Sequence, residues 1–495
     1  MTEKIRGSVF EQYKKEFDKE PLKHETLDFS DITKKKQKNP DKSWEETFSQ
    51  VLNKEKADIS LGYGIHLMYK DNLVTPENHF DKYDGPFMKF PNSIMGNLTV
   101  AKEWNASLTD LIDRSAKLRR LTDIKQLGYL SFPEADQTEW PGTDFNLEKF
   151  LHSRYDHSVL TAIMNLVILR ISKAEGFTKC SEKDILKSFI SSIMHDSATV
   201  AGGDATKKVS PQELDEEKLV KTILQSEEIN NLFQGIKFNE KDKEDIQNII
   251  FNEGPFGKLL DITDKLAYTS RDFEEITSLL KTNKYSSPES EELLAVAKEK
   301  PQIYDIAFDL RFDDDKGVFC TNPKRLGEAL KIRALMHNYI YLNPQAQIVE
   351  AAVIYPALTK LLKSGDKKIS VENLLSQSDS YFEKVLCEAL GDTEPFPNVI
   401  KSIRQIIKNK DIKVDVYSDR PSAEAAVADL KQNGRHICNV IDKTKGIKTG
   451  TGILVEKENK LIPFKEGYPD KDKEIQEIAD RIKTVRIYHS NEPIV

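Results

Sequence analysis

The chain has 495 residues, enough for roughly two to four domains of ordinary size, and 38% of its residues are hydrophobic. Because these residues are spread along nearly the whole length, a disordered chain is excluded and a soluble, mostly helical protein is indicated. The formal net charge of −8 does not suit a protein that coats nucleic acid, although it leaves room for a local basic pocket.

The sequence carries no mark of an oxidising compartment or of a membrane. Its four cysteines are too widely spaced for a disulfide scaffold or a zinc knuckle, so we expect reduced thiols. The N-terminal stretch is charged throughout and lacks the apolar segment of a signal peptide. No run approaches the roughly 18 apolar residues of a membrane span. We therefore expect a cytoplasmic protein with no membrane partner.

Residues 1–85 are polar and rich in Lys, Asp and Glu, and we interpret them as an N-terminal extension. The lysine-rich run at 34–38 is typical of a solvated helix and turn. An arm that binds nucleic acid or another partner is the alternative interpretation of this run.

From about residue 86 onward, apolar residues recur at three- and four-residue spacing, which is the pattern of amphipathic helices. The segments that show it are 108–130, 150–171, 184–194, 216–233, 244–251, 258–280 and 323–341. Strand-like alternation is scarce, so the sequence predicts a helical core over residues 86–345. The helical pattern continues through an extension at 346–408.

Beyond residue 408 the pattern changes. Strands are predicted at 412–418, 452–457 and 484–490, with a turn at 459–461 and helices at 423–432 and 472–482. These elements indicate a small α+β module over residues 409–495. The predicted fold class is therefore mostly α, with a helical core and a small C-terminal α+β module.

Three features of the helical core together offer ligands for one metal ion. They are His157 near the start of a helix, the doublet His195-Asp196 at the end of a second, and Asp264 on a third. Neutral imidazoles with carboxylates suit a divalent transition metal such as Mn, Fe, Co, Ni or Zn. Adjacent helical residues point about 100° apart, so the doublet reaches one ion only at a helix end or a local distortion.

The order His, His-Asp, Asp resembles the HD superfamily of metal-dependent phosphohydrolases. Residues 119–128, 132–133, 154–158 and 264–272 are similar to motifs of its deoxynucleoside triphosphate triphosphohydrolase branch. The match spans roughly residues 95–345, and the tail at 478–488 is faintly similar. The resemblance implies a helical HD-domain core around a divalent ion (Mn, Fe, Co, Ni, Zn or Mg).

In that family the ion would be held by His157, His195, Asp196 and Asp264. The resemblance further implies a set of nucleotide-binding residues: Arg154 and Lys265 on phosphate oxygens, Tyr268 and Asp272 near the 3′-hydroxyl of the sugar, Gln126 and Leu127 beside sugar and base, and Arg333 on the outer phosphates. Water would attack the α-phosphorus, and nucleoside and inorganic triphosphate would leave.

The loop after the His-Asp doublet departs from the family pattern. Related enzymes carry a histidine-rich loop there, whereas this chain has no histidine between His195 and His337, and Thr199 stands where the first one belongs. Because a buried carboxylate can serve as general acid or base, the sequence offers three candidates for proton transfer. They are Asp204, Asp215 and Glu216.

Lys207 or Lys208 would be an added phosphate contact beside these carboxylates. The alternative is that residues 202–204 form only a turn and that Lys207 and Lys208 are a solvated pair. The family pattern is also interrupted by an insertion at 134–148, which we interpret as a surface loop that caps the pocket or contacts another subunit.

Three functions stay open at this point. The first is hydrolysis of a (deoxy)nucleoside triphosphate, and the second is hydrolysis of another phosphoester, such as a phosphodiester, a nucleoside monophosphate or an alarmone-like nucleotide. The third is a nucleotide-binding regulator that has lost turnover, which the missing histidines favour. The expected partners are a nucleotide and, from the resemblance, further copies of the chain in a homo-oligomer; nucleic acid is not expected.

Overall fold

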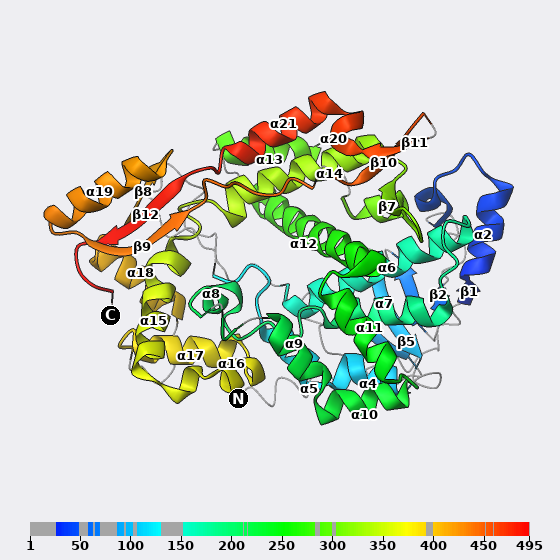
Figure 1. Cartoon of the computed structure of the whole chain (residues 1–495), viewed down its shortest axis with the longest axis horizontal. Helices are drawn as coiled ribbons and strands as arrows, with labels where there is room; N and C mark the ends of the chain where they lie inside the picture. Colours follow the sequence, from blue (N-terminus) through cyan, green and yellow to red (C-terminus); the bar gives the residue numbers. More distant parts are fainter. Residues whose placement is uncertain are drawn as a thin grey trace.

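The computed structural model describes residues 26–48, 58–62, 65–69, 87–93, 96–101, 106–129, 152–210, 212–214, 216–282, 288–298, 303–392, 399–450, 452–458 and 460–494. Helices dominate these residues, and the strands form three small sheets (Figure 1). The predicted fold class, mostly α with a small α+β region at the C-terminal end, is confirmed.

Helices make up most of the core and of the extension that follows it. The core helices are α4 (Ala106–Arg114), α5 (Ala116–Arg119), η2 (Arg120–Asp123), α6 (Arg154–Ala174), α7 (Glu182–Met194), α8 (Gly203–Lys207), α9 (Glu216–Leu224), α10 (Glu227–Gly235), α11 (Glu240–Ile250), α12 (Gly254–Thr282), α13 (Pro288–Lys298), η4 (Ile303–Phe308), α14 (Pro323–Met336) and the π-helix η5 (His337–Tyr341). The extension consists of the π-helix η6 (Val349–Ile354), α15 (Tyr355–Ser364), η7 (Lys367–Ile369), α16 (Val371–Ser376), α17 (Asp379–Ala389) and α18 (Val399–Asn409).

Two predicted helices are divided in the structure. The segment predicted at 108–130 breaks at Ser115 into α4 and α5 and ends in η2. The segment predicted at 216–233 is split at Ser226, whose hydroxyl accepts the N–H of Ile229 and starts α10. Periodicity does not detect such a break, because a capping serine leaves the apolar spacing almost unchanged.

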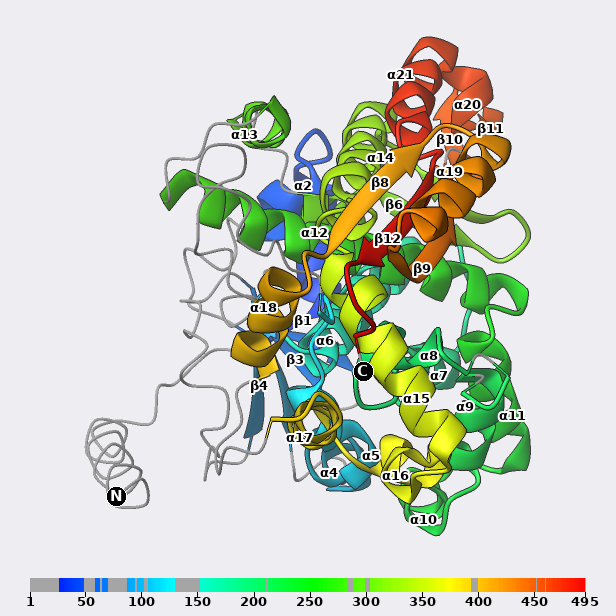
Figure 2. The ribbon, with the colours of Figure 1, turned by 90° about the vertical axis from the view of Figure 1, so that its left-hand side faces the viewer.

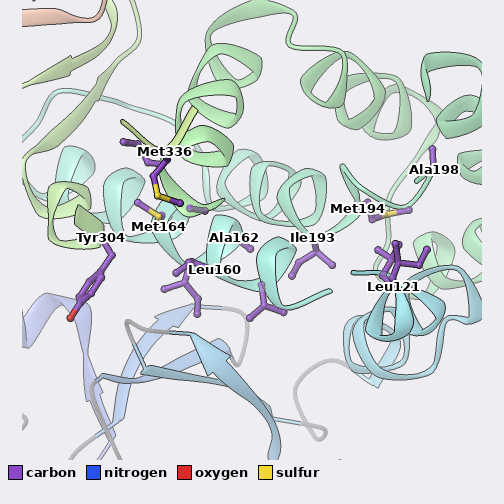
Figure 3. Close-up of a cluster of buried hydrophobic side chains, with 14 of the residues drawn as sticks. Leu121, Leu160, Ala162, Met164, Ile193, Met194, Ala198, Tyr304 and Met336 are labelled. Carbon is purple, nitrogen blue, oxygen red and sulfur yellow. The ribbon is translucent and has the colours of Figure 1, made fainter. Parts of the chain in front are cut away.

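The helix α6 forms the centre of the core. Its apolar side chains point in nearly all directions, as expected of a helix surrounded by other elements. Figure 3 shows Leu160 and Met164 of α6 in one apolar cluster with Ile193 of α7 and Met336 of α14. Each such side chain contributes roughly 1.5–3 kcal/mol by leaving water. This packing sets the mutual positions of the helices that carry the site.

A five-stranded sheet in the N-terminal part was not predicted. It has the order β1-β2-β3-β5-β4 and consists of β1 (Thr26–Asp28), β2 (Asp58–Gly62), β3 (Ile65–Tyr69), β4 (Phe87–Ser93) and β5 (Gly96–Ala101). Strands β2 and β4 pack against α6. The lysine-rich run lies in α2 (Phe29–Lys38), which buries Phe29 and Ile32 in the core. This part of the predicted extension therefore packs on the core.

The C-terminal strands divide between two sheets. Strands β8 (Lys413–Tyr417), β12 (Val485–Ser490) and β9 (His436–Asp442) form one antiparallel sheet in that order. Figure 2 shows α19 (Arg420–Gln432) along this sheet, on which Ala423 packs against Val485 and Ile487. In contrast, β10 (Leu454–Lys457) and β11 (Lys460–Pro463) extend the hairpin of β6 (Leu310–Asp313) and β7 (Gly317–Cys320). The helices α20 (Phe464–Gly467) and α21 (Pro469–Asp480) follow.

The insertion at 134–148 lies outside the described residues. Among the helices that the structure describes, none combines the length and the apolar character needed to cross a membrane.

Candidate metal centre and its pocket

The start of α6 is set by a capping box. The hydroxyl of Ser153 accepts the N–H of Asp156 at 3.2 Å, and the carboxylate of Asp156 accepts the N–H of Ser153 at 2.9 Å. The helix therefore begins at Arg154, and His157 follows three residues later on the same face. Both side chains point toward the end of α7.

His195 is the C-cap of α7, so the His-Asp doublet lies where the helix ends. The Nδ1 atom of His195 donates to the carbonyl oxygen of Ser192 at 2.7 Å. A carbonyl can only accept, so the proton lies on Nδ1 in the neutral ring and Nε2 keeps its lone pair for a metal. Asp196 lies beyond the end of α7, so its side chain does not have to point 100° away from that of His195. Its Oδ2 lies 3.7 Å from Nε2 of His195.

Three helices bring the four predicted ligands to one point. The Nε2 atoms of His157 and His195 are 3.2 Å apart, and Oδ1 of Asp264 on α12 lies 2.8 Å from the first and 3.4 Å from the second. Asp196 Oδ2 is 3.8 Å from His157 Nε2. Ligand atoms of His157, His195 and Asp196 all lie within 4.8 Å of one another, a spacing that could hold a metal ion.

This donor set fits a divalent ion. Two ligands at about 2.0–2.2 Å from the same ion, at tetrahedral or octahedral angles, are separated by roughly 3.0–3.5 Å. The separations of 2.8 to 3.8 Å around His157 bracket that range. Imidazole nitrogens combined with carboxylate oxygens are the donors that Mn, Fe, Co, Ni and Zn accept.

The electrostatics of the cluster favour positive charge at its centre. Burial lowers the pKa of His195, but the carboxylates of Asp196 and Asp264 raise it to about 9. Burial raises the pKa of Asp264, but hydrogen bonds from His157 and His195 bring it well below its usual range. The two carboxylates thus stabilise a cationic species between them, which is what binding of a metal ion requires.

Cationic side chains line one side of the cluster. Arg154 places Nη1 at 3.5 Å from the carboxylate of Asp196 and Nη2 at 3.4 Å from Asp204. Lys265 is paired back along α12 with Asp261 at 2.5 Å, and Lys207 ends α8. Of the cations predicted to grip phosphate, Arg154 is therefore the one that touches a candidate ligand.

The three residues predicted to transfer protons differ in their position relative to the candidate metal ligands. Asp204, whose side chain is 62% exposed, reaches the site through its ion pair with Arg154. Glu216 begins α9, while Asp215 lies outside the described residues. Thr199, where the resemblance predicted a histidine, donates to Oδ1 of Asp196 at 3.4 Å.

On α12, Tyr268 and Asp272 lie one turn apart beyond Asp264. The ring of Tyr268 is 6.3 Å from the ring of His157, centroid to centroid. Asp272 is 1% exposed, and its two oxygens are engaged by the hydroxyl of Tyr341 at 2.6 Å and by Nε2 of His152 at 2.9 Å. Tyr268 and Asp272 thus extend the candidate site along α12, beyond the four predicted ligands.

The segment with Gln126 and Leu127 is tied to the start of α6. The N–H of Arg154 donates to the carbonyl oxygen of Ile124 at 2.8 Å. The backbones of Lys125 and Ser153 form an isolated antiparallel β-bridge. The side-chain oxygen of Gln126 is buried and accepts no hydrogen bond from the described residues. Leu127 packs against the apolar core. Gln126 thus offers an acceptor for a ligand hydroxyl or amine.

His337 and Tyr341, two side chains on the element that follows the helix of Arg333, were not singled out in the sequence. Arg333 on α14 donates from Nε to the hydroxyl of Tyr268 at 3.3 Å. His337 and Tyr341 follow it at four-residue intervals and have ring centroids 5.1 Å apart. Because residues four apart share a helix face, this spacing alone signals a common surface.

No protein-family model and no curated protein matches the chain. The fold is similar to that of a hypothetical protein from Aquifex aeolicus, with a TM-score of 0.54 and 17% identity over 82% of this chain and 96% of the other. It is also similar to a phosphohydrolase from Bacteroides thetaiotaomicron, with a TM-score of 0.55 and 14% identity over 81% and 99% of the two chains. Nearly the whole length of each solved structure is thus covered, and the chain shares the fold of a structurally characterised phosphohydrolase.

Proposed function

We propose that this protein is a metal-dependent phosphohydrolase of the HD type and that its substrate is a (deoxy)nucleoside triphosphate. The observation that carries the proposal is the meeting of His157, His195, Asp196 and Asp264 from three helices. In an ordinary cluster of surface carboxylates, no such arrangement is expected. Here the Nε2 atoms of two imidazoles and the oxygens of two carboxylates converge on one point. The fold shared with a phosphohydrolase supports the reaction class.

In the proposed reaction a water oxygen attacks the α-phosphorus, the bond from phosphorus to the 5′-oxygen breaks, and that oxygen takes a proton. Nucleoside and inorganic triphosphate are the products. A bound divalent ion would supply Lewis acidity for the phosphoryl group and acidify the water. Arg154 would oppose the phosphate charge beside the ligands, and Asp204, which pairs with Arg154, would carry the proton.

The remainder of the pocket matches a nucleoside. Tyr268 presents a ring beside His157, and the buried side-chain oxygen of Gln126 suits a sugar hydroxyl or a base amine. Arg333 lies next to Tyr268 and carries positive charge toward the outer phosphates. These contacts support a nucleotide over a simple phosphomonoester.

A regulator that binds nucleotide without turnover is the second candidate, and a specific observation favours it. Thr199, a hydroxyl that does not exchange protons at neutral pH, stands beside Asp196, and the side chain of Asp204 is largely exposed to solvent and not enclosed with the cluster. Such a protein would keep the metal and the phosphate contacts and lose the proton transfer.

Incubation of the purified protein with a nucleotide panel, in Mn, Co, Ni, Mg or chelator, tests both candidates when products are separated by chromatography. We expect nucleoside and triphosphate from at least one triphosphate, with activity lost in His195→Ala and Asp264→Ala. Asp261→Ala is the matched control, since this carboxylate lies one turn before Asp264 on α12 and its ion pair among the described residues is with Lys265.

Each outcome assigns the function differently. Release of phosphate or of a monophosphate would keep the metal-dependent hydrolysis and overturn the triphosphohydrolase chemistry. Nucleotide binding by calorimetry, with no product from any substrate, would establish the regulator. Full activity in Asp264→Ala would remove the metal centre from the mechanism.

A further inference from the structure

The three-stranded sheet of the C-terminal module has two edges, and the edges differ. Its order is β8-β12-β9, so β8 and β9 each pair with β12 on one side only. Figure 2 shows β8 at one side of this sheet, next to β12. An edge strand leaves part of its backbone N–H and C=O groups unpaired and can therefore act as a template for a further strand. Because proteins protect edges against such pairing, an edge without protection indicates an interaction surface.

The edge formed by β9 is protected. The register between β9 and β12 shifts between Tyr488 and His489, and such irregularities disfavour the addition of a strand. The N–H of Val440 donates to the side-chain oxygen of Asn439 at 2.8 Å, so it is not available to another chain. The strand also packs against η6 and α15. A further strand is therefore not expected at β9.

The edge formed by β8 has no such protection within the described residues. Its register with β12 is continuous from Lys413 to Tyr417, and the strand contains no proline. A second strand could thus align along its full length.

The ladder of the sheet shows which backbone groups of β8 are unpaired. The carbonyl oxygen of Thr484 accepts the N–H of the residue that follows β9, at 2.8 Å. Because successive residues of a strand bond to opposite sides, Ile487, three residues after Thr484, bonds toward β8, where it is opposite Asp415. Val414 and Val416 flank Asp415, so their N–H and C=O groups point away from β12. Among the described residues, no hydrogen bond is made to these outward groups.

Val416 adds apolar surface to this edge. In the described part of the chain, Val416 and Val440 are the exposed large hydrophobic side chains, at 48% and 45%. They lie on the two opposite edge strands, β8 and β9. Pairing of β8 with a further strand would take Val416 out of water.

The charged residues of β8 are Lys413 and Asp415, and both remain accessible. Lys413 lies 3.3 Å from Asp411 and is still 60% exposed, while Asp415 lies 3.1 Å from His489 and is 40% exposed. A lysine alone on an edge repels a second copy of the same strand. With an aspartate two residues away, the strand becomes complementary to itself.

This complementarity selects a second copy of the chain as the occupant. When two β8 strands run antiparallel with Val414 opposite the same residue of the other copy, Lys413 of each copy lies opposite Asp415 of the other. These two pairs are of the type without hydrogen bonds, in which side chains approach most closely and opposite charges stabilise. A register shifted by two residues would instead bring the two copies of Asp415 together, which is destabilising.

We propose that β8 is a dimerisation edge, at which two copies of the chain pair their β8 strands antiparallel about Val414. The two three-stranded sheets then form one continuous sheet of six strands. This pairing is independent of the proposed function, because no residue of the candidate metal centre takes part. Since each copy contributes one short strand, the dimer is weak and depends on concentration.

The test is analytical ultracentrifugation of the full chain across the micromolar range, in wild type, Val416→Lys and Val440→Lys. Wild type should pass from monomer to dimer as its concentration rises. Val416→Lys should raise the dissociation constant of the dimer roughly 10-fold or more, because a lysine enters the interface twice. Val440→Lys is the matched control: the same change, at nearly equal exposure on the other edge, should leave the dissociation constant unchanged. Thermal melts of each variant report whether it folds.

The register is tested by Lys413→Asp, with Lys413→Arg as the conservative variant. The first change places like charges opposite each other in both pairs and should also weaken the dimer roughly 10-fold or more. The second keeps the charge and should dimerise as wild type does. A wild type that stays monomeric at every concentration overturns the proposal, as does equal dimerisation by Val416→Lys and wild type. A dimer unaffected by Lys413→Asp rejects the pairing about Val414.

Discussion

At the scale of single residues, His152 ties together two carboxylates on α12. Its ring lies between two carboxylates, with Nε2 at 2.9 Å from Asp272 and Nδ1 at 2.9 Å from Glu275. Burial lowers the pKa of His152, but Glu275 and Asp272 raise it to about 9. The imidazole is therefore charged at neutral pH and holds Asp272 in place on the pocket face of α12.

His152→Ala should lower the free energy of unfolding by roughly 3–5 kcal/mol, because it leaves the buried carboxylate of Asp272 unpaired. In the wild type the folded pKa of His152 lies above the unfolded value of about 6.5, so the folded state binds the proton more tightly. This stabilisation is complete below about pH 6.5 and is lost as pH rises through about 9. Urea denaturation at pH 6.5 and pH 9.5 measures both effects.

His436→Ala is the control for that experiment, since His436 is exposed on β9. It should leave the unfolding curves and their pH dependence unchanged. If His152→Ala retained the wild-type loss of stability between the two pH values, another group would be its source.

At the scale of elements, the helical extension supports the loop that follows the His-Asp doublet. The N–H of Ala201 donates to Leu374 on α16 at 2.9 Å, and the N–H of Gly202 donates to the carboxylate of Asp379 at 2.8 Å. The other oxygen of Asp379 accepts the N–H of Lys125 at 2.9 Å, next to Gln126. The start of α17 thus positions both the loop that follows His195-Asp196 and the segment of Gln126.

Gly202→Ala tests the close packing of this loop. Gly202 has a φ of +81°, and a Cβ there would come within 2.3 Å of the Thr206 hydroxyl and 2.8 Å of the Phe382 ring. Strain and overlap together should cost roughly 2–4 kcal/mol in thermal or urea unfolding. Gly176→Ala is the matched control, because its φ is also +81° but nothing lies within 4 Å, so only about 1–2 kcal/mol is expected. Equal losses in the two variants would contradict the packing argument.

Asp379→Asn should destabilise the protein by about 1–3 kcal/mol, because the N–H groups of Gly202 and Lys125 bond to different oxygens of Asp379 and the amide nitrogen that replaces one of them cannot accept. Burial raises the pKa of Asp379 to about 6, although the N–H groups of Lys125 and Gly202 oppose the rise. The folded state therefore binds this proton more tightly, and wild-type stability should fall as pH rises from about 4 to 6. The variant should lack that fall in urea titrations; if it shows the same slope, another group is responsible.

At the scale of the whole molecule, metal binding should be linked to global stability, because the proposed ligands come from three separate helices. Saturating Mn or Co at about 100 times its dissociation constant should add roughly 2.7 kcal/mol to the free energy of unfolding. Chelator should reverse the gain, and thermal melts should show no gain in His157→Ala or Asp264→Ala. A gain of the same size in Asp264→Ala would place the ion elsewhere.

How far the site could be foreseen differs from residue to residue. Order and helical position in the sequence indicated His157, His195, Asp196 and Asp264, and the structure brings them together. The hydrogen bond from Arg333 to the carbonyl oxygen of Lys448 could not be foreseen, because the two residues lie 115 positions apart and meet only through the packing of the C-terminal module.

By itself, the sequence determined the mostly helical class, the helices that carry the four predicted ligands and the absence of histidines from the loop after Asp196. These features depend on residue type and on spacing within a few residues. Only the tertiary structure decided the sheets. Strands β10 and β11 join β7 of the core, while β8, β9 and β12 form a separate sheet with β12 in the middle. Strand partners lie far apart in the chain, and hydrogen bonding between strands does not depend on which residues pair, so local pattern carries no record of the choice.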